Sequence, residues 1–235
     1  ERSSYMLPVA VGCSYNRCKF CTLFRHLKYR ELPMEQIEAE LDESAVVGGN
    51  PKHVFLGDGN AFGLATKQLL EITDLIHRYF PGCQAINMDG TITNIQAIPE
   101  ELLALRKAGI CHLYLGIESG LDDVLRYMGK DHNLDQAYRQ IDRIQRAGFM
   151  FDAHIMTGIE DMDGDLKTEL PPQILNRTQP QRIINFLCSV RSAPLFQEAQ
   201  AKTFIPATEL ENLQEERLLL ELLKRTGRWL RRVHD

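Results

Sequence analysis

Several features common in proteins are missing from this sequence, and each absence narrows what the chain can do. Its 235 residues include six cysteines, too few for a disulfide scaffold. No apolar run approaches the roughly 20 residues that cross a bilayer, and no signal-peptide pattern precedes Cys13. We therefore expect a cytoplasmic protein without membrane contact. The net charge of −5 gives no overall attraction for nucleic acid, which favours a small-molecule partner instead.

Short apolar runs alternate with amphipathic stretches, and this alternation sets the expected fold. With 44% hydrophobic residues, the chain can bury one sizeable core. Repeated strand and helix periods predict an α/β fold, a partial (β/α)6 TIM-like barrel, with a doubly wound sheet as the alternative. The predicted strands are residues 6–11, 53–56, 85–88, 110–116, 149–156 and 182–188, and the predicted helices are residues 34–47, 64–79, 99–108, 120–128, 134–147 and 167–177.

We expect residues 1–191 to form the barrel and residues 192–235 a C-terminal helical extension packed on it. The part from Thr208 onward is charged and is typical of a solvated helix. In either architecture, ligands bind where loops follow the carboxyl ends of the strands. Asn87 and Asp89 share one face near such an end, so they are candidate contacts by position.

Three of the six cysteines fall within nine residues, directly after the first predicted strand. Cys13, Cys18 and Cys21 are soft ligands on one loop at the mouth of the expected barrel. Three thiolates can hold three corners of a cubane iron–sulfur cluster and leave the fourth iron open. The loop also carries cations, which we expect to lower the thiol pKa values and favour metal-binding thiolate. These cations are Arg17, Lys19 and Arg25.

The alternative for this loop is a structural zinc site, completed by His26 as a fourth ligand. Zinc sites usually combine two separated ligand pairs, and no second pair is found in the sequence. Cys83, Cys111 and Cys188 are scattered singly and are interpreted as small buried apolar residues. The sequence therefore favours an iron–sulfur cluster over a zinc-binding scaffold protein.

This cysteine loop resembles that of the radical S-adenosylmethionine (SAM) superfamily, over about Val9 to Arg191. The likeness is nearest to subgroups containing tRNA methylthiotransferases and oxygen-independent coproporphyrinogen oxidases. It implies a 4Fe-4S cluster on the three cysteines, SAM on the open iron, and an electron donor such as flavodoxin or ferredoxin. Phe20 occupies the family's aromatic position near the adenine. Four residues separate Cys13 from Cys18, where the family usually has three.

Further segments resemble the family's SAM contacts. Gly57, Asp58 and Gly59 stand where it has a Gly-Gly-Glu segment that binds the methionine amino group, although the same residues also suit a tight turn. Glu118, in a segment like Gly-x-Glu-Ser-Gly, is expected to bind ribose hydroxyls or the SAM amine. These residues make the chain an expected radical SAM enzyme, an oxidoreductase or transferase that reductively cleaves SAM and abstracts hydrogen from a substrate that the sequence does not identify.

Two further positions are candidates with strong structural alternatives. Lys130 lies where the subgroups often carry Arg, but a lysine lacks the bidentate fork, and a solvated side chain is the favoured interpretation. His154 lies on a strand resembling the one that meets adenine, and a buried core histidine is the alternative. No catalytic residue is assigned.

Overall fold

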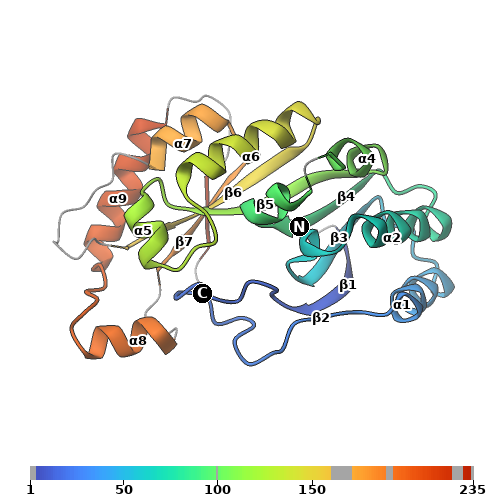
Figure 1. Cartoon of the computed structure of the whole chain (residues 1–235), viewed down its shortest axis with the longest axis horizontal. Helices are drawn as coiled ribbons and strands as arrows, with labels where there is room; N and C mark the ends of the chain where they lie inside the picture. The colour runs from blue at the N-terminus through green and yellow to red at the C-terminus, as the bar shows by residue number, and fades with distance from the viewer. Residues whose placement is uncertain (1–3, 99, 160–170, 189–192, 224–229, 234–235) are drawn as a thin grey trace. The chain divides into compact units, whose positions relative to one another are not determined.

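The computed structural model describes residues 4–98, 100–159, 171–188, 193–223 and 230–233, and strands alternate with helices along them (Figure 1). The chain divides into two compact units. The first comprises Glu1–Asn16, Leu23–Leu115 and Asp142–Met150, and the second comprises Arg17–Thr22, Gly116–Ile141 and Phe151–Asp235. Strand β5 (Ile110–Glu118) and helix α6 (Leu134–Arg146) each contribute residues to both.

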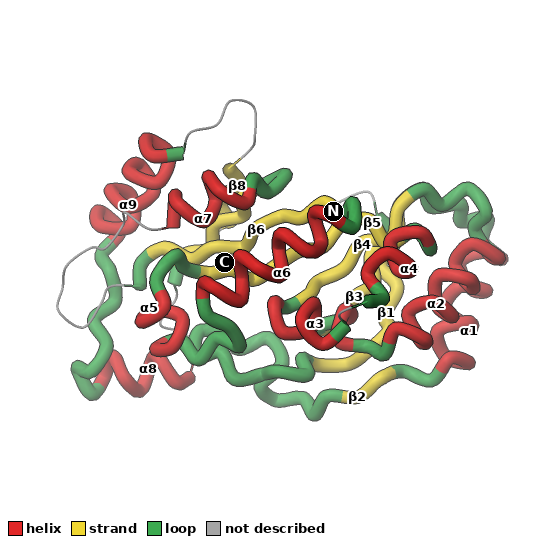
Figure 2. The backbone as a smooth tube through the Cα atoms, turned by 45° about the horizontal axis from the view of Figure 1, so that its top comes forward, coloured by secondary structure: helices red, strands yellow, loops and turns green. Residues whose placement is uncertain are grey.

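The first unit is built on parallel strands with one short antiparallel edge. Its strand order is β2-β1-β3-β4-β5, and only β2 runs antiparallel to its neighbour. Helices α1 and α2 lie side by side (Figures 1 and 2). The elements are β1 (Tyr5–Gly12), β2 (Arg30–Glu31), α1 (Met34–Val46), β3 (His53–Gly59), a 3-10 turn (Ala61–Gly63), α2 (Thr66–Tyr79), β4 (Ala85–Gly90), α3 (Ile92–Ala97) and α4 (Leu102–Lys107).

Helical periodicity explains how these helices pack. In α2, Leu69, Ile72 and Ile76 recur at helical spacing and are fully buried, so one apolar stripe faces the core. In β3, by contrast, Val54 and Leu56 are fully buried. Alternate strand residues point to the same face, so these two mark the same side of the sheet. The buried residues of α2 and β3 therefore follow the helix and strand periods on which the sequence prediction rests.

The second unit repeats the arrangement with fewer strands. Strand β6 pairs in parallel with β7, and β7 pairs in parallel with β8. Helices α7 and α9 contact each other and lie side by side (Figures 1 and 2). The elements are α5 (Asp122–Tyr127), β6 (Met150–Thr157), α7 (Pro171–Thr178), β7 (Ile183–Leu187), α8 (Ala193–Gln200), α9 (Glu209–Leu222) and β8 (Leu230–Val233).

All six predicted strands are confirmed, and the fold class is α/β with mostly parallel strands. Strand β2 and helix α3 were not predicted. The helix predicted from residue 167 begins in a segment outside the described residues, and its described part is α7. The wholly helical interpretation of the C-terminus is wrong, because α9 ends at Leu222 and Leu230–Val233 is a strand. Pairing with β7 overrides the weak local pattern there. The division at residue 191 stays a prediction.

Candidate functional site

The cysteine loop begins where β1 ends, in the first unit. Gly12 pairs with Gly59 of β3 after a shift in register, and its φ of 82° lies in the left-handed region. Cys13 follows with a partly exposed thiol, whose sulfur accepts a hydrogen bond from the Asn16 N–H at 3.4 Å. Asn16 has a φ of 49° and donates from its side chain to the Phe24 carbonyl at 2.9 Å. Such conformations cost energy and cluster at functional sites.

The end of β3 provides the predicted Gly57–Gly59 segment. Gly59 has a φ of 145°, and a Cβ there would overlap the carbonyl oxygen of Gly12. Only glycine therefore permits the two strands to pair so closely. Asp58 between the glycines is exposed and has a φ of 64°. The segment forms the last residues of β3, and it presents a carboxylate on a strained backbone.

Asn60 links this segment to the cysteine loop and was not singled out from the sequence. Its side-chain N–H donates to the Ser14 hydroxyl at 3.3 Å, and its own side chain is only 6% exposed. Its Oδ1 is buried and has no hydrogen-bond partner among the described residues. A buried orphan acceptor is uncommon in proteins and suits a polar ligand or a water. The preference of Asn for turns is the only local signal that could have indicated it.

Cys18, Phe20 and Cys21 belong to the second unit. Both thiols are partly buried, and the Cys21 N–H donates to the Cys18 carbonyl at 3.2 Å. Phe20 packs against an apolar cluster that includes Val124 and Met128. The aromatic ring is thus held by the protein on one side, and its contact with adenine stays a prediction.

Glu118 and Lys130 form a buried ion pair in the same unit. Their side chains are 9% and 6% exposed, and Lys130 Nζ lies 3.3 Å from Glu118 Oε1. Gly116 makes room for the pair, since a Cβ there would lie 3.0 Å from the ammonium. Glu118 has a φ of 64°, matching that of Asp58 at the end of β3. The interpretation of Lys130 as a solvated lysine is wrong, because the fold buries it beside a carboxylate.

Charge around Cys18 differs from the expectation. Burial raises the pKa of this thiol to about 11, and Lys130 opposes the shift only in part, while Glu118, Cys21 and Asp131 add to it. The expected fall in thiol pKa is therefore wrong for Cys18, since burial outweighs the cations. For Lys130, burial opposes the charge, but Glu118 above all raises its pKa above the ordinary value, with a further contribution from Asp131. The ammonium stays charged at neutral pH.

His154 lies in β6 and is partly buried. Its ring meets the ring of Phe186 edge-on at a centroid distance of 5.2 Å. Burial lowers its pKa, although Glu118 and Asp152 oppose this. A neutral imidazole packed on an aromatic ring fits the alternative of a core histidine.

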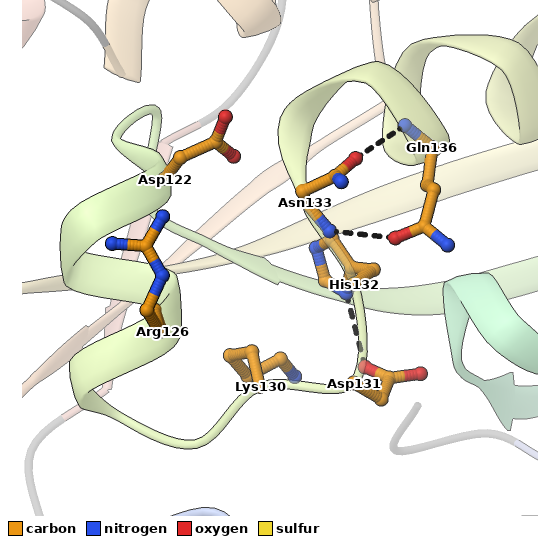
Figure 3. Close-up of a pocket in the computed structure, with 7 residues that line it drawn as sticks. All are labelled: Asp122, Arg126, Lys130, Asp131, His132, Asn133 and Gln136. Atoms are coloured by element: carbon orange, nitrogen blue, oxygen red, sulfur yellow. Dashed lines mark hydrogen bonds and ion pairs between the residues drawn. The ribbon is translucent and has the colours of Figure 1, made fainter.

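A polar pocket borders the Glu118–Lys130 pair within the second unit, with a volume of about 300 Å³ (Figure 3). His132 Nδ1 lies 3.0 Å from Asp131 Oδ1, and both side chains are almost fully buried. Its Nε2 is buried without a hydrogen-bond partner among the described residues. Figure 3 shows α5 on one wall and the start of α6 on the other. The lining residues are Asp122, Arg126, Lys130, Asp131, His132, Asn133 and Gln136.

Much of this pocket's rim serves to start α6. Asn133 Oδ1 accepts from the Gln136 N–H at 2.9 Å, and Gln136 Oε1 accepts from the Asn133 N–H at 3.0 Å (Figure 3). These reciprocal bonds form a capping box. The Asp122 carboxylate accepts from the Leu134 N–H at 2.7 Å, which satisfies another helix-start donor. Asp122, Asn133 and Gln136 therefore already make hydrogen bonds that stabilise the start of α6.

Each cysteine in the described segments is a thiol outside any disulfide. Cys83 and Cys111 are buried, as predicted, whereas Cys188 is only partly buried against the apolar cluster that holds Phe20. Within the described part of the chain, no three His, Cys, Asp or Glu side chains are arranged as a preformed metal site. His26 is exposed. The donor set suits a cluster, because three partly accessible soft thiols lie within one short loop.

The family follows from comparison with known proteins. A model of the radical SAM superfamily matches residues 7–168, more than half of the chain. The chain belongs to the radical SAM superfamily. Among curated relatives, the threonylcarbamoyladenosine tRNA methylthiotransferase MtaB of Thermotoga maritima is 25% identical over 203 residues, covering 81% of this chain and 45% of that protein. The haem chaperone HemW of Bacillus subtilis is 25% identical over 170 residues, covering 71% and 42%.

Solved structures of other proteins share the fold. The coproporphyrinogen III oxidase HemN of Escherichia coli matches with a TM-score of 0.70 at 13% identity, covering 94% of this chain and 52% of that one. Methylornithine synthase PylB matches with a TM-score of 0.65 at 17% identity, covering 97% and 63%. This chain spans less than half the length of the two curated relatives. No described helix is long and apolar enough to cross a membrane.

Proposed function

We propose that this chain is a radical SAM enzyme acting on a small molecule. The observation that carries the proposal is the buried Glu118–Lys130 pair beside Cys18, in a chain of this superfamily. Burying two charged side chains costs free energy unless their charges are compensated or bind a ligand. A buried Glu118–Lys130 pair next to Cys18 therefore supports a binding site for a zwitterion. The amino acid part of SAM is such a group.

Cys13, Cys18 and Cys21 would hold a 4Fe-4S cluster, and loading would bring their thiolates together. The bound cluster and SAM would supply reductive cleavage of a carbon–sulfur bond and a radical that abstracts hydrogen from substrate. The protein binds, orients and excludes water. Because Cys18 is a neutral thiol in the metal-free chain, cluster binding releases its proton.

The remaining candidates would contact SAM. The Lys130 ammonium offers a point charge to the carboxylate, and Glu118 offers an acceptor to the amine or the ribose. Gly57, Asp58 and Gly59 present close backbone and one carboxylate, and Phe20 presents a ring face. His154 would shape the cavity through packing rather than through proton transfer, since burial keeps it neutral.

Substrate, electron source and location extend the same proposal. The net charge of −5 supports a small molecule over a nucleic acid. A low-potential protein such as flavodoxin or ferredoxin would supply the electron. Six thiols outside any disulfide suit a reducing compartment, which supports a cytoplasmic location.

The test is anaerobic purification followed by iron and sulfide analysis and an assay for 5'-deoxyadenosine with dithionite and SAM. We expect about four irons per chain. Cys18→Ala should lose iron and cleavage, whereas the matched control Cys83→Ala should keep both, because Cys83 is buried just before β4 and lies outside the cysteine loop.

Two outcomes would overturn the proposal. Zinc without iron would make this a structural metal protein. Four irons with SAM binding but no 5'-deoxyadenosine under any reductant would indicate a protein that carries the cofactors without cleaving SAM.

A further inference from the structure

The cysteine loop is tied to a helix far along the chain. Lys19 stands between Cys18 and Cys21, and its ammonium lies 2.9 Å from Glu198 Oε1 on α8. The same ammonium lies 4.0 Å from the centroid of the Tyr127 ring. A lysine in this loop is thus held by a carboxylate and an aromatic face, both in the second unit.

Tyr127 closes the contact from the other side. Its hydroxyl donates to Glu198 Oε2 at 2.6 Å, so the two carboxylate oxygens are shared between Tyr127 and Lys19. The ring of Tyr127 stacks on the ring of Phe204, with the two ring centroids 6.1 Å apart. Hydrogen bonding from Tyr127 and then from Lys19, against some opposing burial, lowers the pKa of Glu198 and keeps it anionic. The Glu198 carboxylate is therefore a fixed negative charge with two directional partners.

Backbone and apolar contacts fix the same short segment. The Lys19 N–H donates to the Met128 carbonyl at 2.9 Å. Phe20 packs against a buried cluster in which Leu195 of α8 and Phe204 meet Val124 and Met128. Both residues between Cys18 and Cys21 therefore contact α5, α8 or the chain just after them. The loop's geometry depends on helix α8 as well as on its own sequence.

We propose that Glu198 is a positioning residue for the cluster: through Lys19 and Tyr127 it fixes the Cys18–Cys21 segment and offsets the cation beside it. This rests on the proposed function, because it presumes that Cys18 and Cys21 are cluster ligands. Ligands held in place release metal slowly, and nearby outer-shell groups tune metal sites. The charge has a second effect, because a cation near a cluster favours its reduced state and an anion disfavours it.

These two effects predict a signature that lost packing would not give. Glu198→Gln removes the negative charge beside Lys19 and loosens its anchor, so the reduction potential of the cluster should rise while iron is released faster. Lys19→Met removes the cation and leaves Glu198, so the potential should fall while iron release again quickens. Opposite shifts in potential with parallel effects on iron release would indicate a charge pair acting on the cluster.

The experiment uses anaerobic, cluster-loaded protein without SAM. Iron release to a ferrous chelator and the cluster midpoint potential are measured in wild type, Glu198→Gln, Lys19→Met and the double variant. The matched control is Glu221→Gln, which makes the same charge change in an exposed ion pair of the same unit, with Arg217. Release from either single variant should be about five- to tenfold faster than from wild type. The double variant should add little, because both changes remove one contact.

The inference is overturned if Glu198→Gln releases iron at the rate of Glu221→Gln, or if the effects of Glu198→Gln and Lys19→Met on iron release add fully in the double variant. It is also overturned if these two single variants shift the cluster potential in the same direction. Glu198→Asp should restore most of the wild-type behaviour, which separates positioning from misfolding. Wild-type protein that holds no iron would instead contradict the proposed function.

Discussion

The two units hold their candidate site residues in place by different physical means. In the first unit, Gly12 and Gly59 bring two strand ends together, and Asp58 is exposed on a left-handed backbone. In the second unit, Glu118 and Lys130 are buried as an ion pair beside Cys18. The first region depends on the shape of the backbone, whereas the second depends on charge in a low-dielectric setting. Changes that alter shape or charge alone should therefore separate them.

The largest effect is expected for the backbone of the first region. Gly59→Ala places a Cβ on the Gly12 carbonyl oxygen in a conformation that other residues rarely adopt, and should cost about 5 kcal/mol or prevent folding. Gly48→Ala is the matched control, because its φ of 82° is also left-handed but its Cβ would meet nothing within 4 Å. It should cost about 1 kcal/mol. Urea unfolding measures both, and equal losses would show that the close approach does not matter.

The buried charges of the second region should give the next largest effect. Lys130→Met leaves Glu118 buried without its partner and should lower the free energy of unfolding by about 3 to 5 kcal/mol. Adding Glu118→Gln should recover most of that stability, because no charge then stays buried. SAM binding to cluster-loaded protein should remain lost in the double variant. If the double variant recovered SAM binding together with stability, the Glu118–Lys130 pair would not be part of the cofactor site.

The same contrast explains what the sequence could predict. The cysteine loop, the Gly57–Gly59 segment and Glu118 were singled out because each is a local motif at the end of an apolar run. Lys130 was misjudged because its neighbours Gly129 and Asp131 look like a solvated turn, and only the fold shows that it is buried. The raised pKa of Cys18 likewise depends on burial, which the local sequence does not show.

Non-local contacts account for the other errors. Strand β8 forms because β7 offers it a parallel partner, and its own residues carry no strong strand pattern. The contact between Lys19 and Glu198 joins residues from opposite ends of the chain. Asn16 and Asn60 were missed because an asparagine in a turn is ordinary, and their significance lies in conformation and burial. Sequence patterns therefore predicted the strands and pointed to the cysteine loop, but not which charges the fold buries.

Asp89 allows a test of buried charge in the first unit, where the candidate residues otherwise depend on the shape of the backbone. Burial raises the pKa of this carboxyl to about 7. Because the folded protein holds this proton more tightly than the unfolded chain, the contribution of Asp89 to stability is greatest below pH 4 and falls as pH rises towards 7. Between pH 5 and pH 8 the free energy of unfolding should drop by roughly 2.5 kcal/mol more in wild type than in Asp89→Asn. Parallel pH profiles of urea unfolding in the two proteins would contradict this.

The smallest effect concerns the rim of the pocket in the second region. Asn133→Ala removes one half of the capping box that starts α6 and should cost about 1 kcal/mol. Since Asn133 and Gln136 are occupied by each other, SAM affinity of the cluster-loaded protein should stay within about twofold of wild type, in contrast to the loss expected for Lys130→Met. Asn133→Asp, which keeps the capping acceptor, is the matched control for stability. A large fall in SAM affinity for Asn133→Ala alone would mean that the cofactor site reaches into the pocket, and that charge in the second region acts over a wider set of residues than the Glu118–Lys130 pair.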